Sequence, residues 1–342
     1  MPGHDVHAAF QQWAETRLTE PVHRALFKRM ARRSGIDHRW SVLPAGNFGG
    51  SPTEPGGFYA GDWPGTAQRM QVYGEQAPAL AEQAIAALRE RVSLDGVTHI
   101  VVASCTGFVA PGIDQILAAR LGLKPMVERL LVGYMGCYAA VVALRSARHI
   151  VRSDPNARVL VVCVELTTLH LQNDAAIEPI LGMMQFGDGA AAALVSADAT
   201  GLALDTPFSA TLPGSADLIQ WDIGDHGFIM HLSGGVPGAI GSAMSDHDAR
   251  ASLFPVPVEQ ISNWAVHAGG RSILDAVETA LKLPDDALRH SRDILSAYGN
   301  MSSATLMFVL SRLLDAPPEG QGAAIAFGPG LAAEGFLFRA AA

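Results

Sequence analysis

This chain has few cysteines, and its basic residues are fewer than its acidic residues. The 342 residues include three cysteines, Cys105, Cys137 and Cys163, and no two of them form a CxxC pair. Their number and spacing exclude a disulfide framework and favour a reducing cytoplasm. Lysine and arginine together number 24 against 33 acidic residues, which gives a net charge of -9. This balance does not favour nucleic acid as a partner.

The sequence also shows no pattern typical of a membrane-spanning helix or of a signal peptide. The uncharged run Leu130–Leu144 is shorter than the roughly 20 residues that a membrane-spanning helix needs. The first residues, MPGHD, lack the basic and apolar regions of a signal peptide. Hydrophobic residues make up 49% of the chain and charged residues 17%, as in a compact globular protein. We therefore expect a soluble, cytoplasmic protein with no membrane partner.

Buried strands and amphipathic helices alternate along the first half of the chain. Strands are predicted at 98–104, 157–164 and 186–195, and helices at 7–33, at 66–92, from residue 113 and from about Cys137. The segment Trp40–Trp63 is rich in glycine and proline and is predicted to be an irregular loop. The alternation predicts an α/β fold with helices on both faces of the sheet.

The second half repeats this theme. Strands are predicted within 202–223 and at 227–232, helices at 256–265, 273–281, 291–298 and 304–314, and a closing hairpin within 323–338. A Gly-x-Gly turn flanks a strand near the end of each half, at Gly187/Gly189 and at Gly328/Gly330, which hints at an internal duplication. We place the domain boundary near Thr200, giving halves of 1–200 and 201–342.

The segment Leu130–Leu144 suits a cysteine nucleophile. Gly133 and Gly136 make a tight bend, and Cys137 follows where a buried helix is predicted to begin. A thiol at a helix N-terminus faces unpaired N–H groups, which we expect to lower its pKa. The alternative is that Cys137 is a small buried hydrophobic residue, as most free cysteines are.

Two later residues are candidate partners of Cys137. His267 ends an apolar strand before two glycines, and Asn300 lies between Gly299 and a predicted helix start. Each has a structural alternative, a hydrogen-bonded core histidine and a helix cap. Together, Cys, His and Asn can hold an acyl group covalently and stabilise an enolate after CO2 leaves.

The basic cluster Lys28–Arg33 is either a solvated helix face or a site for a phosphate-bearing ligand.

Seven short motifs appear in the order and spacing of the type III polyketide synthases, the chalcone/stilbene synthase-like family, and resemble its bacterial members. The motifs are FKRM (27–30), RM (69–70), GC (136–137), FGDG (186–189), WAVHAGG (264–270), YGNMSSA (298–304) and GPG (328–330). The resemblance implies a thiolase fold, with two similar five-stranded halves in α-β-α-β-α layers, and a homodimer. It also implies a condensing acyltransferase that uses acyl-CoA and malonyl-CoA, with no metal and no further cofactor.

The resemblance also assigns roles. Cys137 resembles the acyl-carrying nucleophile, and His267 and Asn300 resemble the residues that stabilise the malonyl-derived enolate. Phe186 and Met230 match the two gate positions between the CoA tunnel and the cavity. The positions that match the cavity wall are Cys105, Thr106, His170, Trp221 and Ser302. The positions that match the CoA phosphate site are Arg29 and Arg33, with Lys28 or Arg32 as replacements for a third basic residue that is Leu26 here.

Departures from the plant pattern limit the expected product. Met230 replaces a phenylalanine and Trp221 a glycine, so we expect a locally smaller cavity and an aliphatic or small malonyl-derived product rather than a flavonoid. A strand that usually precedes the first helix is missing from the sequence pattern.

Two alternatives to a type III polyketide synthase stay open. One is a related enzyme that takes acyl groups from acyl-carrier protein, although HQAN does not occur around His267. The other is a non-catalytic thiolase-fold scaffold.

Overall fold

Two mixed sheets and three layers of helices build the protein. The computed structural model describes residues 3–47, 51–317 and 319–341. The N-terminal sheet has the order β4-β3-β5-β6, with β3 parallel to β4 and β5 and β6 antiparallel to β5. Its strands are β3 (His99–Ser104), β4 (Glu128–Gly133), β5 (Val159–Glu165) and β6 (Gly189–Val195).

The C-terminal sheet repeats the arrangement. Its order is β10-β11-β12-β7, with β10 parallel to β11 and β12 antiparallel to both β11 and β7. The strands are β7 (Leu202–Thr211), β10 (Ile261–Val266), β11 (Gln321–Gly328) and β12 (Ala332–Ala340). The run β3-β5-β6 thus matches β10-β11-β12 in order and direction, and this match confirms the predicted duplication.

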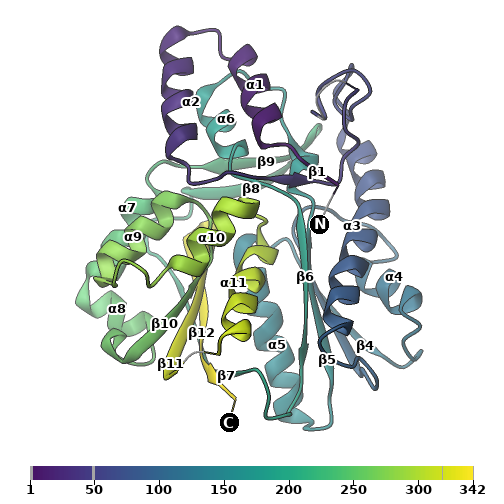
Figure 1. Cartoon of the computed structure of the whole chain (residues 1–342), viewed down its shortest axis with the longest axis vertical. Coiled ribbons are helices and arrows are strands. Elements are labelled where there is room, and N and C mark those ends of the chain that lie inside the picture. Colours follow the sequence, from purple (N-terminus) through teal and green to yellow (C-terminus); the bar gives the residue numbers. More distant parts are fainter. Residues whose placement is uncertain (1–2, 48–50, 318, 342) are drawn as a thin grey trace.

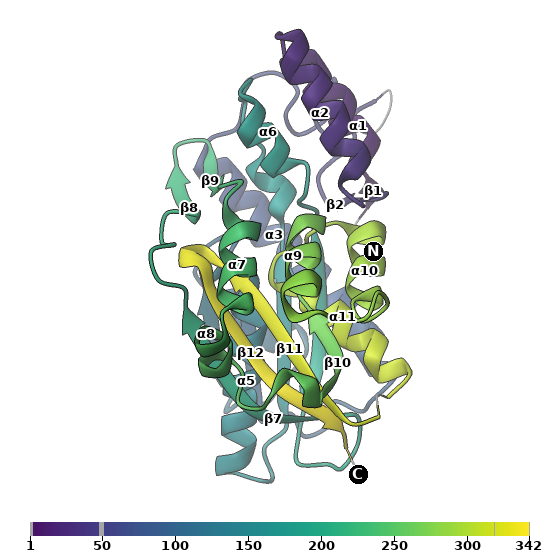
Figure 2. The ribbon, with the colours of Figure 1, turned by 90° about the vertical axis from the view of Figure 1, so that its left-hand side faces the viewer.

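Two helices lie between the sheets, α5 (Ala139–Ser153) and α11 (Ser303–Asp315), as Figure 1 shows. The outer face of the N-terminal sheet is covered by α3 (Thr66–Arg89) and α4 (Ile113–Arg120). The outer face of the C-terminal sheet is covered by α7 (Val236–Ser245) and α9 (Arg271–Leu281), with α8 (His247–Leu253) and α10 (Arg289–Tyr298) beside them. Figure 2 shows α7 and α9 in front of this sheet. The five layers are those of the thiolase fold.

The pleat of β5 explains why its sequence is an unbroken apolar run. Every residue of the strand is buried. Val161 and Cys163 face the central helices, whereas Val162 and Val164 face α3 and α4. A strand covered on both faces cannot alternate apolar and polar residues. The same logic applies to β3 and β11.

A smaller group of elements lies at the end of the sheets where the candidate site residues gather (Figure 1). It contains the helices α1 (His7–Arg17), α2 (Pro21–Arg33) and α6 (Ile177–Met183), the hairpin β8 (Ile219–Gly224) and β9 (Gly227–Leu232), and the short pair β1 (His4–Asp5) and β2 (Trp40–Ser41). Short 3-10 turns lie at Gly136–Tyr138, Thr167–His170, Val258–Gln260 and Pro329–Leu331.

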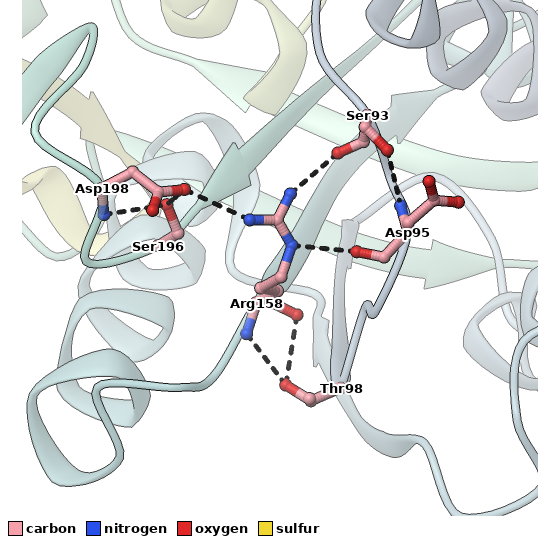
Figure 3. Close-up of polar contacts among 6 residues, drawn as sticks. All are labelled: Ser93, Asp95, Thr98, Arg158, Ser196 and Asp198. Carbon is pink, nitrogen blue, oxygen red and sulfur yellow. Dashed lines mark hydrogen bonds and ion pairs between the residues drawn. The ribbon is translucent and has the colours of Figure 1, made fainter.

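Arg158 ties the link between the two halves to the N-terminal sheet. Its guanidinium donates to the carbonyls of Ser93 and Asp95, at 2.8 and 3.0 Å, and to the carboxylate of Asp198 at 3.2 Å (Figure 3). Its backbone N–H donates to the Thr98 hydroxyl at 3.0 Å. Asp198 lies between β6 and β7, so one side chain holds the loop before β3 and the segment that leads to the second half.

Several sequence predictions need correction. The helix predicted at 7–33 is two helices, because Pro21 starts a new one after a break at 18–20. The helix predicted at 256–265 is wrong, since β10 occupies Ile261–Val266. Helices α6, α7 and α8 were not predicted. Each large sheet has four strands among the described residues instead of the five expected.

The residues described before α1 add no strand to either large sheet. The segment before α1 forms only β1, which pairs with β2 outside both large sheets. Among the described residues, β6 has no strand on its outer edge, whereas β7 lies beside β12 at the matching place in the second half. The unpaired position lies at the sheet edge.

Candidate active site

Cys137 lies in a strained turn at the start of the central helix α5. After β4 the chain passes through Tyr134, with φ of 57°, and Gly136, with φ of 73°, and then forms the 3-10 turn that contains the thiol. A Cβ on Gly136 would lie 2.4 Å from Cδ of Pro329. Only glycine therefore fits, both for its conformation and for the space available. The predicted bend and helix start are confirmed.

His267 and Asn300 are held by a shared network. The His267 backbone N–H donates to the carbonyl of Ile325 at 2.8 Å, which fixes the residue at the end of β10. Asn300 accepts from the Ser302 N–H at 2.8 Å through Oδ1 and donates to the Gly269 carbonyl at 3.2 Å through Nδ2. The amide retains one N–H for another acceptor. Neither ring nitrogen of His267 has a partner among the described residues.

One cavity brings the candidate residues together. Its volume is about 670 Å³. The candidate residues that line it are Cys137, His267, Asn300, Phe186, Met230, Cys105, Thr106, Trp221, His170 and Ser302. Residues from both halves and from the β8–β9 hairpin therefore meet at one place. The structure supports the predicted grouping, which sequence spacing alone could not establish.

Burial opposes charge on both members of the Cys-His pair. It raises the pKa of the Cys137 thiol to about 11, although hydrogen bonds from Ser302 and Asn300 favour the thiolate. It lowers the pKa of His267 to about 3. The expected lowering of the thiol pKa is therefore wrong for this structure, because desolvation outweighs the N–H groups at the helix start. Burial therefore favours the neutral form of each side chain before substrate binds.

Alkylation of Cys137 should therefore depend on pH. With a raised thiol pKa and no imidazolium beside it, the thiolate fraction should grow by about tenfold per pH unit between about pH 6 and about pH 9. Cys105 and Cys163 are buried, and burial raises the pKa of each thiol, so iodoacetamide should label them far more slowly. Peptide mass spectrometry of timed reactions measures all three rates. A Cys137 rate that stays constant across this range would show a preformed thiolate–imidazolium pair instead.

His170 joins two segments of the cavity wall, and both of its ring nitrogens are hydrogen-bonded to backbone groups. Its Nδ1 accepts from the Phe228 N–H at 2.9 Å, so Nε2 carries the hydrogen and donates to the Thr106 carbonyl at 2.7 Å. The ring stacks on Phe228 with centroids 4.3 Å apart. Burial lowers the pKa of His170 to about 3. The side chain thus joins β9 to the loop after β3.

Trp221 closes the wall above Cys105. Its indole N–H donates to the Cys105 carbonyl at 2.9 Å, and the Tyr134 hydroxyl donates to the Trp221 carbonyl at 2.6 Å. His170 and Phe228 contact the indole edge to face. A large side chain with so many contacts has little freedom to move, which supports the expectation that it limits cavity volume.

The segment that carries Phe186 is hydrogen-bonded to the segment that carries Asn300. A parallel bridge pairs the two residues. Around it, the Gly187 N–H donates to the Asn300 carbonyl at 3.0 Å, and the Asn300 N–H donates to the Gln185 carbonyl at 2.8 Å. Met230, the other gate candidate, lies on β9.

Glu165 does not line the cavity but binds two residues that do, Cys105 and Thr106, and it is not among the predicted site residues. It is fully buried at the end of β5 and accepts from the Cys105 N–H at 2.9 Å and the Thr106 hydroxyl at 2.8 Å, and from the Ser303 hydroxyl. The Cys105 thiol also lies 3.4 Å from it. Burial raises the pKa of Glu165. The signal was available, because a glutamate directly after a fully apolar strand needs partners.

The three proposed CoA residues lie outside the cavity on α2. Lys28, Arg29 and Arg33 are exposed, and Lys28 pairs with Glu15 at 3.0 Å. Met30, on the same helix, lines the cavity. The basic face is therefore close to the apolar lining, but Lys28 is partly occupied by its ion pair.

No group of three or more His, Cys, Asp or Glu residues in ranges 3–47, 51–317 and 319–341 is arranged to hold a metal ion. No helix in that part of the chain is both long and apolar enough to span a membrane.

The fold and the Cys-His-Asn cavity define a thiolase-fold condensing enzyme. Comparison with known families then narrows the class. The family described as chalcone and stilbene synthases matches with its N-terminal domain at residues 7–199 and with its C-terminal domain at residues 204–342. The chain belongs to this family of type III polyketide synthases, and it is a polyketide-forming condensing enzyme of the acyltransferase class.

Solved structures agree with this assignment. PKS-I from the brown alga Ectocarpus siliculosus shares 28% identity, with a TM-score of 0.86 over 99% of this chain and 95% of that chain. 1,3,6,8-Tetrahydroxynaphthalene synthase from Streptomyces coelicolor A3(2), a bacterial type III polyketide synthase, also shares 28% identity, with a TM-score of 0.85 over 100% and 97%. CsyB complexed with CoA-SH shares the fold at 24% identity, with a TM-score of 0.83 over 99% and 97%. Family membership favours the condensing enzyme over the carrier-protein-dependent and non-catalytic alternatives.

Proposed function

We propose that this enzyme loads an acyl group from acyl-CoA on Cys137, extends it with malonyl-CoA and cyclises the product to a pyrone, resorcinol or phloroglucinol. The observation that carries this proposal is the meeting of Cys137, His267 and Asn300 in one cavity. We assign residues 1–200 to the half that carries the nucleophile and 201–342 to the half that carries His267 and Asn300.

The first step is acyl transfer. Sγ of Cys137 attacks the thioester carbonyl of acyl-CoA, and its proton passes to His267, so both charges arise together inside the cavity. The C–S bond to CoA then breaks, and the departing CoA thiolate takes the proton from His267. The neutral resting pair fits this sequence, because neither charge has to be held before substrate arrives.

The second step is decarboxylative condensation. The malonyl carboxylate leaves as CO2, and its bonding electrons form an enolate whose oxygen accepts from His267 and from the remaining N–H of Asn300. The enolate carbon attacks the acyl group on Cys137, and Sγ leaves. The Cys137 thiolate takes a proton from water, and the chain is two carbons longer on CoA.

We assign CoA recognition to α2. Arg29 and Arg33 are exposed one turn apart, and each guanidinium can bind a phosphate through two donors. Lys28 would have to exchange Glu15 for the ligand. The CsyB structure with CoA-SH supports a CoA site in this fold. We propose no cofactor beyond these substrates, and the three free thiols support a cytoplasmic location.

Intact-protein mass spectrometry tests the function. The protein is incubated with a set of acyl-CoAs and with malonyl-CoA, and we expect the mass of one acyl group to appear on Cys137 and polyketide products to follow. Products formed only from acyl-carrier-protein thioesters would overturn the CoA assignment. The absence of any adduct or product would overturn the function itself.

We also propose a homodimer formed through β4. This strand pairs with β3 on one side only, and its residues are mostly exposed. Several large apolar side chains are exposed along this edge, namely Phe108, Met126, Leu130 and Leu131. An open strand edge with exposed apolar side chains is a template for pairing with a second copy.

Substitution of the edge should separate the copies. Leu131→Glu places a charge on β4, and we expect a shift from dimer to monomer in sedimentation or light scattering, because a charge opposes strand pairing. Ile223→Glu is the control, since Ile223 is 59% exposed on the hairpin and Leu131 is 43% exposed. Equal behaviour of the two variants would exclude β4 as the interface.

A further inference from the structure

Arg39 is a buried cation in the wall of the catalytic cavity. It is 2% exposed, and no ion pair holds it among the described residues. Its Nε donates to Nδ1 of His7 at 3.0 Å, and its guanidinium lies 4.6 Å from the centre of the Phe10 ring. Burial lowers the pKa of Arg39 to about 10, with Asp5 and Asp188 opposing the change. The side chain is still charged at neutral pH, so an unfavourable burial has to be offset by its contacts.

These contacts converge on the segment that carries Phe186. Nη1 donates to the Phe186 carbonyl at 2.7 Å and to the Met183 carbonyl at 3.1 Å. One nitrogen thus fixes the end of α6 and the start of the Phe-Gly-Asp-Gly turn. A charged donor holds a carbonyl more firmly than a neutral donor does.

The stem of Arg39 also packs against the segment that carries Asn300. A Cβ on Gly299 would lie 2.8 Å from Cγ of Arg39, and a Cβ on Gly187 would lie 3.4 Å from its Cβ. Glycines next to Asn300 and Phe186 leave the room that the arginine stem fills. Because these two segments are hydrogen-bonded to each other, a change at Arg39 would move both.

His7 completes the support. Burial lowers the pKa of His7 to about 4, with the Arg39 charge adding to the effect, so the ring is a neutral acceptor toward Nε. Its other nitrogen lies 2.8 Å from the Gln11 amide. Nη2 of Arg39 has no partner among the described residues. The guanidinium therefore anchors α1 as well as the turn beside the cavity.

We propose that Arg39 is a positioning residue for malonyl decarboxylation, which holds Phe186 and Asn300 in their reactive placement without contacting the reacting atoms. The proposal rests on the enolate role assigned to Asn300 above. It concerns decarboxylation more than acyl loading, because Arg39 contacts the Phe186 carbonyl and lies against Gly299, the residue before Asn300. Among the described residues, Arg39 makes no hydrogen bond with Cys137. A shift of about 1 Å in a positioned group can lower a rate by about 100-fold.

The test compares Arg39→Met and Arg39→Lys with wild type in CO2 release from malonyl-CoA and in alkylation of Cys137. We expect Arg39→Met to lower kcat for decarboxylation by roughly 10- to 100-fold, with little change in KM or in the alkylation rate. Arg39→Lys should recover part of the loss, since it keeps the charge but not the planar fork. Equal losses in both readouts, or no loss in either, would overturn the proposal.

Arg158→Met is the matched control. Arg158 also donates three guanidinium hydrogen bonds to protein oxygens, but it lies at the loop end of the N-terminal sheet (Figure 3). The Arg158→Met variant should unfold at a lower temperature than wild type, and the folded variant should release CO2 from malonyl-CoA at the wild-type rate. A raised KM for malonyl-CoA with unchanged kcat in Arg39→Met would mean that Arg39 binds the substrate directly, which also contradicts positioning.

A second variant keeps the test decisive if Arg39→Met does not fold. Gly299→Ala leaves the arginine in place but forces its stem and the Asn300 segment apart, and it should reproduce the selective loss of decarboxylation. If wild type itself fails to decarboxylate malonyl-CoA, the proposed function fails. If wild type is active and Asn300→Ala is impaired while Arg39 and Gly299 variants are not, only this inference fails.

Discussion

Cys137→Ala should abolish acyl loading and lower polyketide formation by on the order of 10³-fold or more, as expected when a covalent nucleophile is removed. His267 and Asn300 remain in the cavity, so CO2 release from malonyl-CoA should persist in this variant. Intact mass after incubation with acyl-CoA measures the first effect, and trapping of labelled CO2 measures the second. The two steps of the proposed reaction are thereby separated within one variant.

Cysteine-to-alanine variants at the two other positions are the controls for this experiment. Cys163 is fully buried in β5 and Cys105 is 4% exposed in the wall, so neither should carry the acyl group. Cys105→Ala removes a thiol that lies 3.2 Å from the Ser302 hydroxyl and should change product distribution more than loading. An acyl adduct that persists in Cys137→Ala and disappears in Cys105→Ala would move the nucleophile to Cys105.

Much of the fold could be predicted from local pattern. The unbroken apolar runs of β3 and β5 and the Gly-Cys bend before α5 are strong signals, because burial on both faces and positive φ each restrict sequence sharply. The helix at Val236–Ser245 gave no such signal. Its sequence contains two glycines and a proline, and packing against α9 and the C-terminal sheet stabilises it despite low helix propensity. Pro21 is the first residue of α2, a position where proline is common because its missing N–H has no partner in the helix.

The site divides in the same way. The motif order allowed Cys137, His267 and Asn300 to be chosen, and the structure places all three on one cavity. The electrostatics could not be read from the sequence, because the helix start suggested a lower thiol pKa while the depth of burial decides the opposite direction. His170 illustrates a further limit. A histidine near a site suggests chemistry, yet both of its ring nitrogens are bonded to backbone groups from distant segments.

Long-range partners explain why Glu165 and Arg39 escaped notice. Glu165 accepts from groups that follow β3 and from Ser303, the first residue of α11, and Arg39 donates to carbonyls near residue 186. The sequence does not identify these partners, because those of Glu165 lie about 60 to 140 positions away and the Met183 and Phe186 carbonyls lie about 145 positions from Arg39. Charged residues in apolar surroundings are nevertheless a usable clue, because each must find such partners.

His267→Ala and Asn300→Ala should differ in which steps they impair. Loss of the imidazole removes the proton acceptor for Cys137 and one enolate donor, so we expect both acyl loading and decarboxylation to fall by roughly 10²- to 10⁴-fold. Loss of the amide removes one donor, and decarboxylation should fall by roughly 10²- to 10³-fold, with loading changed much less. Asn300→Asp is a further contrast, because a carboxylate of similar size would repel the enolate.

Single-turnover loading and CO2 release, measured separately for each variant, check these values. The bonds of Asn300 to Ser302 and Gly269 mean that Asn300→Ala also loosens the turn after His267, so thermal unfolding must accompany the rates. Ser302→Ala is the matched control for decarboxylation only, since it leaves the backbone N–H that Asn300 binds. Its hydroxyl also bonds to the Cys137 thiol, so loading is not compared in this variant. Unchanged decarboxylation in both His267→Ala and Asn300→Ala would contradict the enolate site. Unchanged loading in His267→Ala would assign activation of the thiol to another group.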